Sequence, residues 1–339
     1  MKIAVIGAGA VGSVLGGLLA RAGEDVILVG RQPHVDLLND HGLIIDGASD
    51  RMTIRLRATP RLDVRPDLAL LTVKTQDLPA ALEEYSALLR GVPVVVTQNG
   101  VRADQMAADV LGRQHVVGCV VLFGATYLEP GRVTCTLSRG VVVGEPFAQR
   151  IDPRTRTVAA LLGRAVPVSL AADLPGARWT KLVVNETNAL PAITGGSAQD
   201  VFADGYLRDL TVVLMAEAVG TLRAAGIGMA SLPGTPAWAL ASLLRLPGPL
   251  RRVPAALLAR STGVVPILGS TLQSIRRGVT TEIDYLCGEV VTLGARIGRA
   301  TPYNSAMVDL VHRVEDTGEH LTAWQVRQAI DARESPRTP

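Results

Sequence analysis

The sequence predicts an α/β domain built on a doubly wound parallel sheet, followed by an all-α domain. Three observations lead to this fold class. Short aliphatic runs alternate with helical runs through the first half of the chain, which is typical of strand–helix–strand units. A glycine-rich turn follows the first of these strands and opens a helix. After about residue 175 the pattern changes to helical spacing, with no convincing strand.

The individual elements follow from the spacing of apolar and turn residues. In the first half we expect strands over 3–6, 26–29, 68–73, 94–97 and 116–121, with helices over 11–21, 78–89 and 103–111. A more antiparallel layer follows, with strands over 121–128, 132–137 and 141–143, a helix over 154–164 and a strand over 166–170. The second half is expected to form helices over 177–188, 207–225, 235–246, 266–277, 282–297 and 301–312. We place the domains at 1–172 and 173–332, with a frayed tail over 333–339.

Composition excludes several classes of protein. With 48% hydrophobic and 19% charged residues, the 339-residue chain is a compact globular protein. A net charge of +3 with scattered arginines gives no case for a nucleic-acid partner. The N-terminus enters a strand directly and is no signal peptide, and prolines and arginines interrupt the apolar stretch 237–267, so we expect no membrane span and a cytoplasmic location.

The cysteines argue against a metal site and a disulfide framework. Cys119, Cys135 and Cys287 lie far apart in the sequence and have no C-x-x-C spacing. We therefore expect three buried free thiols and no bound metal.

The glycine-rich turn after the first strand has the pattern G-x-G-x-x-G. In the dinucleotide-binding version of this turn, the first glycine permits the tight bend, the second lets the backbone approach a diphosphate, and the third lets helix and strand pack closely. The diphosphate then binds the free N–H groups at the positive end of the helix. A strand–helix turn without a ligand is the alternative. We expect a Rossmann-type dinucleotide site formed by Gly7, Ala8, Gly9, Ala10, Val11 and Gly12.

The end of the second strand indicates which dinucleotide binds. NAD-specific proteins usually carry an acid there, which binds the 2′-hydroxyl of the ribose. Here the strand is followed by Gly30 and Arg31, whereas Asp25 lies at the opposite end of the strand. The guanidinium of Arg31 suits a 2′-phosphate, although a solvated surface arginine is the alternative. We expect NADPH/NADP as the cofactor.

Polar residues in the second half suggest a site for carbonyl reduction. Lys181, Asn185 and Asn188 are spaced i, i+4 and i+7, so they share one stripe of a helix. A positioned lysine can protonate a developing alkoxide, and asparagines can orient a carbonyl or carboxylate group. A solvent-exposed polar stripe is an equal alternative from spacing alone.

A second polar segment runs from Ser270 to Tyr285 and includes Glu282. Thr281 and Asp284 have the spacing of a capping box at a helix start. By its residue types alone, this pattern favours a structural role for Glu282 as an acid in the first turn of a helix.

Taken together, these motifs resemble the ketopantoate reductase (2-dehydropantoate 2-reductase) family over nearly the whole chain. The segments that carry the resemblance are KIAVIGAGAVGS, VKTQD at 73–77, TQNGV at 97–101, RWTKLVVN at 178–185 and STLQSIRRGVTTEIDY at 270–285. The last two are the most specific. The resemblance implies a helical second domain like that of 6-phosphogluconate dehydrogenase, with NADPH and a branched 2-oxo acid bound between the domains.

The resemblance also assigns roles to residues. It implies that Lys181 is the general acid and that Glu282 acts at the junction of cofactor and substrate. It implies substrate-binding positions at Asn99, Asn185, Asn188 and Ser270. The cofactor-binding positions that it implies, besides the glycine-rich turn, are Arg31, Lys74, Asn99, Ala125 and Glu282.

The chain departs from the family pattern at several places. The second helical asparagine of the family commonly lies eight residues after the lysine, where this chain has Ala189, so we expect Asn188 to replace it through a local shift. Segments 118–123 and 135–138 differ from the usual Thr-rich and Gly- and His-rich segments, and 229–265 is long and rich in proline and leucine. These departures would alter the substrate pocket.

The sequence thus predicts an oxidoreductase that reduces 2-dehydropantoate to (R)-pantoate, a step of pantothenate biosynthesis. A family paralogue that reduces a different 2-oxo acid or biosynthetic ketone is one alternative, and a non-enzymatic NADP(H)-binding module is another. The apolar second half makes a homodimer reasonable.

Overall fold

The computed structural model describes residues 1–47, 50–136, 139–244 and 268–334. Its chain divides into two compact units, Met1–Arg178 with Leu232–Gly234, and Trp179–Ser231 with Thr235–Pro339. The division falls inside helix α6 (Leu174–Asn185), a few residues after the expected boundary at 172. Arg178 belongs to the first unit because its side chain binds carbonyl and carboxylate groups there.

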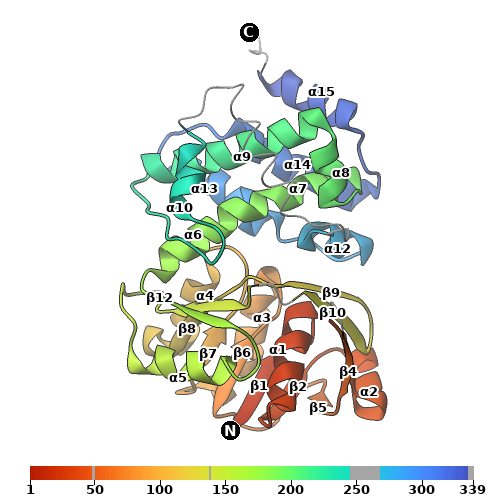
Figure 1. The fold of residues 1–339 in the computed structure, drawn as a ribbon, viewed down its shortest axis with the longest axis vertical. Helices are drawn as coiled ribbons and strands as arrows, with labels where there is room; N and C mark the ends of the chain where they lie inside the picture. Colours follow the sequence, from red (N-terminus) through yellow and green to blue (C-terminus); the bar gives the residue numbers. More distant parts are fainter. Residues whose placement is uncertain (48–49, 137–138, 245–267, 335–339) are drawn as a thin grey trace. The chain divides into compact units, whose positions relative to one another are not determined.

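The first unit is built on an eight-stranded sheet (Figure 1). Six neighbouring strands are parallel to one another. The two remaining strands, β11 and β12, are parallel to each other and antiparallel to these six, since β11 pairs antiparallel with β8. The strand order is β12 (Val168–Ala171), β11 (Val141–Gly144), β8 (Val116–Val121), β7 (Val94–Val96), β6 (Leu68–Leu71), β1 (Lys2–Ile6), β2 (Asp25–Val29) and β5 (Arg57–Thr59). This confirms the expected Rossmann-type domain.

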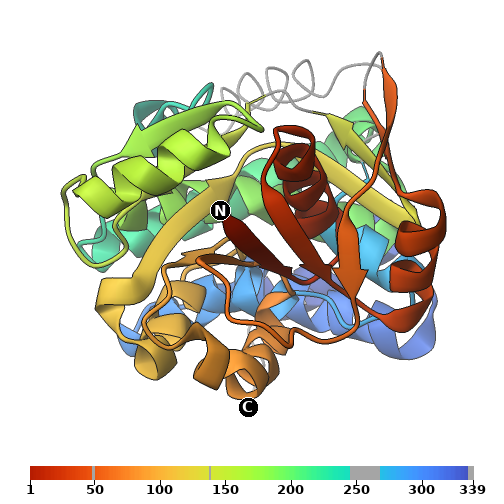
Figure 2. The same ribbon diagram turned by 90° about the horizontal axis from the view of Figure 1, so that it is seen from below.

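Helices cover both faces of this sheet (Figure 2). Helices α1 (Ala10–Arg21) and α5 (Pro153–Leu162) pack on one face, and α3 (Leu78–Leu89) and α4 (Ala103–Leu111) pack on the other. Short 3-10 turns occur at Thr75–Asp77 (η1) and Arg113–His115 (η2). The strands are buried on both sides, which explains why they appear in the sequence as uninterrupted apolar runs.

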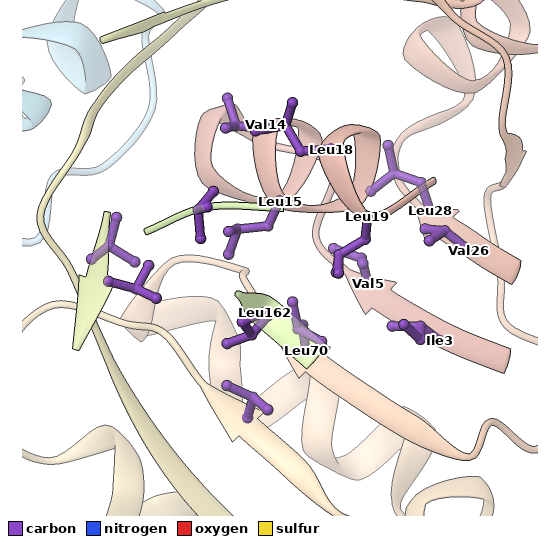
Figure 3. Close-up of a cluster of buried hydrophobic side chains, with 14 of the residues drawn as sticks. Ile3, Val5, Val14, Leu15, Leu18, Leu19, Val26, Leu28, Leu70 and Leu162 are labelled. Carbon is purple, nitrogen blue, oxygen red and sulfur yellow. The ribbon is translucent and has the colours of Figure 1, made fainter. Parts of the chain in front are cut away.

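Helix α1 is buried on two sides. Figure 3 shows Leu15 and Leu19 pointing toward side chains of the eight-stranded sheet. On its other side, a Cβ at Gly17 would lie 2.7 Å from Leu43 Cδ2, which belongs to a second, four-stranded sheet. The order of that sheet is β4 (Arg51–Ile54), β3 (Leu43–Asp46), β10 (Arg132–Thr136) and β9 (Gly124–Glu129).

Helix α2 (Gln32–His41) and three short strands, β3, β4 and β5, were not predicted from the sequence. Helix α2 is polar and buries only His34, Val35 and Leu38, so its apolar stripe is narrow. Strand β4 has one buried residue, Ile54. These elements carry little periodic signal because their burial depends on contacts with α1 and with one another.

The described part of the second unit is helical, as expected (Figure 1). After α6 the elements are η3 (Glu186–Asn188), α7 (Ala189–Thr194), α8 (Ala198–Ala203), α9 (Gly205–Ala224), α10 (Ala237–Ser242), α12 (Ser270–Arg276), η5 (Ile283–Tyr285), α13 (Cys287–Arg296), α14 (Pro302–Thr317) and α15 (Ala323–Glu334). Most helices of this unit contribute residues to one apolar core, and α10 packs against α9. Helices α7, α8 and α15 were not predicted from the sequence.

Three expected segments differ in detail. The helix expected over 177–188 ends at Asn185 and continues as a 3-10 turn. The one expected over 282–297 is interrupted at Leu286, whose φ of −116° and ψ of −98° are not helical. The frayed tail was placed too early, because Arg333 lies in α15 and binds Asp309, whereas 335–339 lie outside the described residues.

All three cysteines are buried free thiols, as predicted. Burial raises the pKa of Cys119 to about 12 and that of Cys135 to about 11. Both side chains and Phe123 belong to the core around α1, so these departures from the family pattern fill the core of the first unit.

The structure describes Cys135 and Thr136 of the altered segment 135–138 but not the two residues that follow, and of the long segment 229–265 it describes residues 229–244. No helix in the described ranges is long and apolar enough to cross a membrane.

Candidate active site

The loops that follow four neighbouring parallel strands lie at one edge of the eight-stranded sheet. They are the glycine-rich turn after β1, Gly30 and Arg31 after β2, Val73 and Lys74 after β6, and Thr97–Asn99 after β7. The structure thus brings most of the expected cofactor residues of the first unit to the edge where such sheets bind ligands. Ala125 is different: it lies on β9 of the second sheet, opposite Cys135.

The glycine-rich turn requires glycine at two positions for steric reasons. Gly7 has a φ of 114°, and a Cβ there would lie 2.5 Å from the backbone nitrogen of Val73. A Cβ at Gly12 would clash with the carbonyl oxygen of Gly7. Because both close contacts are within the protein, they fix the turn before any ligand binds.

Gly9 differs from these two glycines because its Cα faces open space. A Cβ at Gly9 would meet no atom of the described residues within 4 Å. Gly9 is also the N-cap of α1, no side chain caps the helix there, and its first turn contains no acid. The N–H groups of that turn have no acceptor within the helix. The turn therefore fits the diphosphate of a dinucleotide, which would bind these N–H groups.

Arg31 lies at the start of α2 and is exposed. Among the described residues no carboxylate pairs with its guanidinium. Asp25 is at the opposite end of β2, where it pairs in register with Lys2 of β1. A cation without an opposing acid at the end of the second strand suits a 2′-phosphate better than a free 2′-hydroxyl.

A buried histidine that the sequence analysis missed supports the same turn. His34 Nδ1 accepts the N–H of Gly131 at 2.8 Å, and Nε2 lies 3.3 Å from Ser13 Oγ, which donates to the carbonyl of Ala8. Burial lowers the pKa of His34 to about 4, so the ring is neutral and carries its hydrogen on Nε2. Nothing in the sequence near His34 indicates this role, because its partners lie 21 and 97 residues away.

The turn that carries Asn99 is also fixed from several sides. Thr97 Oγ1 donates to Leu71 O, Gln98 Nε2 donates to Val73 O, and Thr75 Oγ1 donates to Asn99 O. Arg178 adds two hydrogen bonds, one from Nη1 to Gln98 O at 2.9 Å and one from Nη2 to Val96 O at 3.0 Å.

Asp104 of α4 neutralises Arg178, and both side chains are buried. Nothing local in the segment RWTKLVVN indicates this role for its arginine. This buried pair fixes the end of β7 and the first turns of α6 together.

In the second unit, the expected polar stripe keeps its geometry. Lys181 is half-buried and Asn185 is buried, both on α6. The 3-10 turn that follows places residues three positions apart on the same side, so Asn188 continues the stripe. Ala189 is buried in the helical core.

The asparagine at the end of this stripe also contacts the segment that carries Ser270. A Cβ at Gly269 would lie 2.7 Å from Asn188 Oδ1, so the amide of Asn188 packs against the residue before Ser270. A larger residue at position 269 would displace the amide of Asn188.

Glu282 is buried, with 4% of its surface exposed. The capping box expected from Thr281 and Asp284 does not form. Thr281 Oγ1 accepts from Ile283 N, and the carboxylate of Asp284 lies 3.1 Å from His312 Nε2 instead. The sequence signal failed because a 3-10 turn, and no α-helix, begins at Ile283. A buried acid that caps nothing is a candidate for chemistry.

A second buried acid, Glu186, follows Asn185 directly. Cys287 Sγ donates to Glu186 Oε2 at 3.2 Å, and Glu186 Oε1 has no partner among the described residues. Burial, together with the charge of Glu217, raises the pKa of Glu186 to about 8, although the bond from Cys287 acts in the opposite direction. The side chain is therefore mainly protonated at neutral pH.

We expect Glu186→Gln to remove a pH dependence of stability. The folded protein retains the Glu186 proton up to about pH 8, whereas the unfolded chain releases it near pH 4.5. Stability from this group is thus complete below pH 4.5 and falls by about 1.4 kcal/mol per pH unit between the two values. Urea unfolding at pH 5, 6, 7 and 8 should show a shallower slope for the variant than for the wild type. The exposed Glu319→Gln serves as control, and equal slopes for Glu186→Gln and the wild type would contradict the assignment.

Comparison with known proteins places this chain among the reductases that the motifs resemble. The family model "Ketopantoate reductase PanE/ApbA" matches residues 3–147, and its C-terminal companion matches residues 173–315. A 2-dehydropantoate 2-reductase of Pyrococcus horikoshii is 28% identical over 94% of this chain and 99% of its own length. Another, from Mesorhizobium japonicum, is 28% identical over 93% of this chain and 98% of its own length.

Solved structures agree with these matches. A PanE/ApbA family ketopantoate reductase from Ralstonia eutropha superposes with a TM-score of 0.78 at 29% identity, over 94% of this chain and 100% of that one. A D-mandelate dehydrogenase with NADH and anilino(oxo)acetate shares the fold, with a TM-score of 0.77 at 21% identity over 94% and 99% of the two chains. With both family models matched and the fold in agreement, the chain belongs to the ketopantoate reductase PanE/ApbA family.

Proposed function

We propose that this protein catalyses the NADPH-dependent reduction of 2-dehydropantoate to (R)-pantoate. Membership of the ketopantoate reductase family supports the reaction. The observation that carries the cofactor assignment is the edge of the eight-stranded sheet. There the glycine-rich turn at the start of α1 suits a diphosphate, and Arg31, which pairs with no carboxylate of the described residues, suits a 2′-phosphate. The cytoplasmic location and the homodimer expected from the sequence stay predictions.

Bound NADPH supplies the hydride that adds to the ketone carbon. The residues of the chain bind, orient and protonate. We assign Lys181 as the general acid that donates a proton to the ketone oxygen, because an ammonium group there stabilises the negative charge developing on that oxygen. We assign Asn185, Asn188 and Ser270 to the substrate.

Asn99 and Glu282 are assigned to the junction of substrate and nicotinamide. The hydrogen bonds around the Thr97–Asn99 turn and the burial of Glu282 support these assignments, since groups fixed before the reaction lower its barrier most. Lys74 and Ala125 are assigned to the cofactor.

Steady-state oxidation of NADPH at 340 nm with ketopantoate, run in parallel with NADH, tests the proposal. Rapid turnover with NADPH and little with NADH is the expected result. A panel of other 2-oxo acids belongs in the same experiment, because the departures from the family pattern leave a paralogue with another substrate as the alternative. Tight binding of NADPH without turnover of any 2-oxo acid would favour a non-enzymatic binding module.

We expect Arg31→Ala to raise the KM for NADPH by about 10- to 100-fold, because a charge-assisted hydrogen bond to the 2′-phosphate contributes about 1.5–3 kcal/mol. The KM for NADH should change little. The matched control is Arg57→Ala, which removes an exposed arginine of β5 that pairs with Asp63. Equal changes for both cofactors would contradict a role for Arg31 at the 2′-phosphate.

A further inference from the structure

Two side chains of α14 hold the residues on either side of Glu282. Glu315 Oε1 accepts the backbone N–H of Thr281 at 2.6 Å. Glu315 Oε2 lies 2.7 Å from His312 Nδ1, and Nε2 of the same ring lies 3.1 Å from Asp284 Oδ1. We call this set the α14 clamp: His312 and Glu315 on the helix, with the Thr281 N–H and the Asp284 carboxylate on the segment that carries Glu282.

The geometry determines the protonation state in which the clamp is complete. Both ring nitrogens of His312 face carboxylate oxygens, and an ionised carboxylate only accepts hydrogen bonds. The ring makes both bonds only as an imidazolium. Partial burial disfavours that charge, but the hydrogen bonds to Asp284 and Glu315 and the charges of these acids outweigh the burial, so the pKa of His312 is raised above 6.5.

The acids of the clamp, Asp284 of η5 and Glu315 of α14 itself, are the charged groups of the described chain within hydrogen-bonding distance of the ring. Helices α7, α9, α13 and α15 also pack against α14, and three titratable groups on these helices bind residues other than His312. Glu217 of α9 accepts from Tyr303 and Asn304 at the start of α14, Arg333 of α15 binds Asp309, and Cys287 of α13 binds Glu186.

We propose that His312 and Glu315 are positioning residues that fix the turn of Glu282 for the reaction. This inference rests on the proposed function, in which Glu282 lies beside cofactor and substrate. Within the turn, Ile283 N donates to Thr281 Oγ1 and Tyr285 N donates to Glu282 O. The clamp ties it to a sixteen-residue helix whose inner face is buried in the core. Neither His312 nor Glu315 is assigned to substrate or cofactor.

The sign of the pH dependence follows from the charged state. A histidine whose pKa is raised in the folded protein contributes stability that is complete below its unfolded pKa, about 6.5, and is lost as the pH rises through the folded value. As the ring loses its proton, one of its two bonds to carboxylates is lost. We therefore expect kcat/KM to decline on the alkaline side as the clamp opens.

The test compares His312→Gln and Glu315→Gln with Arg313→Gln and Asp316→Asn, which change exposed residues of the same helix. A shift of about 1 Å in an active-site group can cost about 100-fold in rate, so we expect kcat/KM at pH 7 to fall by about 10- to 100-fold in the two clamp variants. The decline assigned to His312 should be absent from the pH profile of His312→Gln. The two control variants should behave like the wild type.

A second measurement needs neither turnover nor a folded variant. In the wild type, hydrogen exchange of the Thr281 amide and the NMR titration of the His312 ring are followed from pH 6 to 9. Protection of the amide, corrected for the intrinsic rate, should fall with the same midpoint as the ring titration. If ketopantoate is not reduced, the proposed function fails while this arm still tests the clamp. Wild-type kcat/KM and pH profile in His312→Gln, or protection of Thr281 that is independent of the ring titration, would overturn the inference.

Discussion

Replacement of Lys181 with alanine is expected to lower kcat by about 10²- to 10⁴-fold while the dissociation constant for NADPH stays within about twofold of the wild-type value. The physical reason is that hydride addition leaves a negative charge on the ketone oxygen, and the variant lacks the ammonium group that we assign to stabilise and protonate it. Lys181 is half-buried on α6, whereas the proposed diphosphate site lies in the first unit, so we expect cofactor binding and proton donation to be separable. Kinetics at 340 nm and NADPH fluorescence titration measure the two quantities.

The chain contains three lysines, and the other two provide matched controls. Lys2 lies at the amino end of β1, away from the ligand-binding edge, so Lys2→Ala should leave both quantities unchanged. Lys74→Ala should weaken NADPH binding more than it lowers kcat. Partial recovery of Lys181→Ala by an added primary amine would support proton donation directly. Near-normal turnover of Lys181→Ala would exclude it as the general acid.

Replacement of Arg178 with leucine is expected to lower the free energy of unfolding by about 3–5 kcal/mol, since it leaves one member of a buried ion pair without its partner. The change also removes the donors to Gln98 O and Val96 O. Burial raises the pKa of Asp104 and the charge of Arg178 opposes that rise, so the carboxyl group will tend to take up a proton in the variant. Urea unfolding measures the loss.

Two further variants separate the ion pair from simple loss of an arginine. Arg57→Leu removes an arginine that pairs with Asp63, and both side chains are more than half exposed, so it should cost at most about 1 kcal/mol. The double replacement Arg178→Leu with Asp104→Leu should recover part of the stability, because no charge is then left buried. A loss of stability in Arg178→Leu no larger than that in Arg57→Leu would show that the buried pair contributes little to stability.

The sequence predicted most elements of the first unit because their signals are local. Strands buried on both faces appear as apolar runs, as in Val116–Val121, and helix α3 was expected over its observed range. The glycine-rich turn was recognised because Gly7 and Gly12 meet backbone atoms at fixed positions. Helix α2 and strand β4 have no clear apolar periodicity in the sequence, because their few buried residues are covered by distant parts of the chain.

For the candidate site, the sequence by itself determined which residue types are present and their order: the glycine-rich turn, Arg31 without a nearby acid, and the stripe from Lys181 to Asn188. Only the tertiary structure decided what holds them. In the folded chain Arg178 pairs with Asp104, 74 residues away, and Asp284 pairs with His312, 28 residues away. The capping box expected at Thr281 does not form. The reason is physical: propensity and periodicity report bonds within a turn or two of chain, whereas the partner of a buried charge is fixed only when the whole core packs.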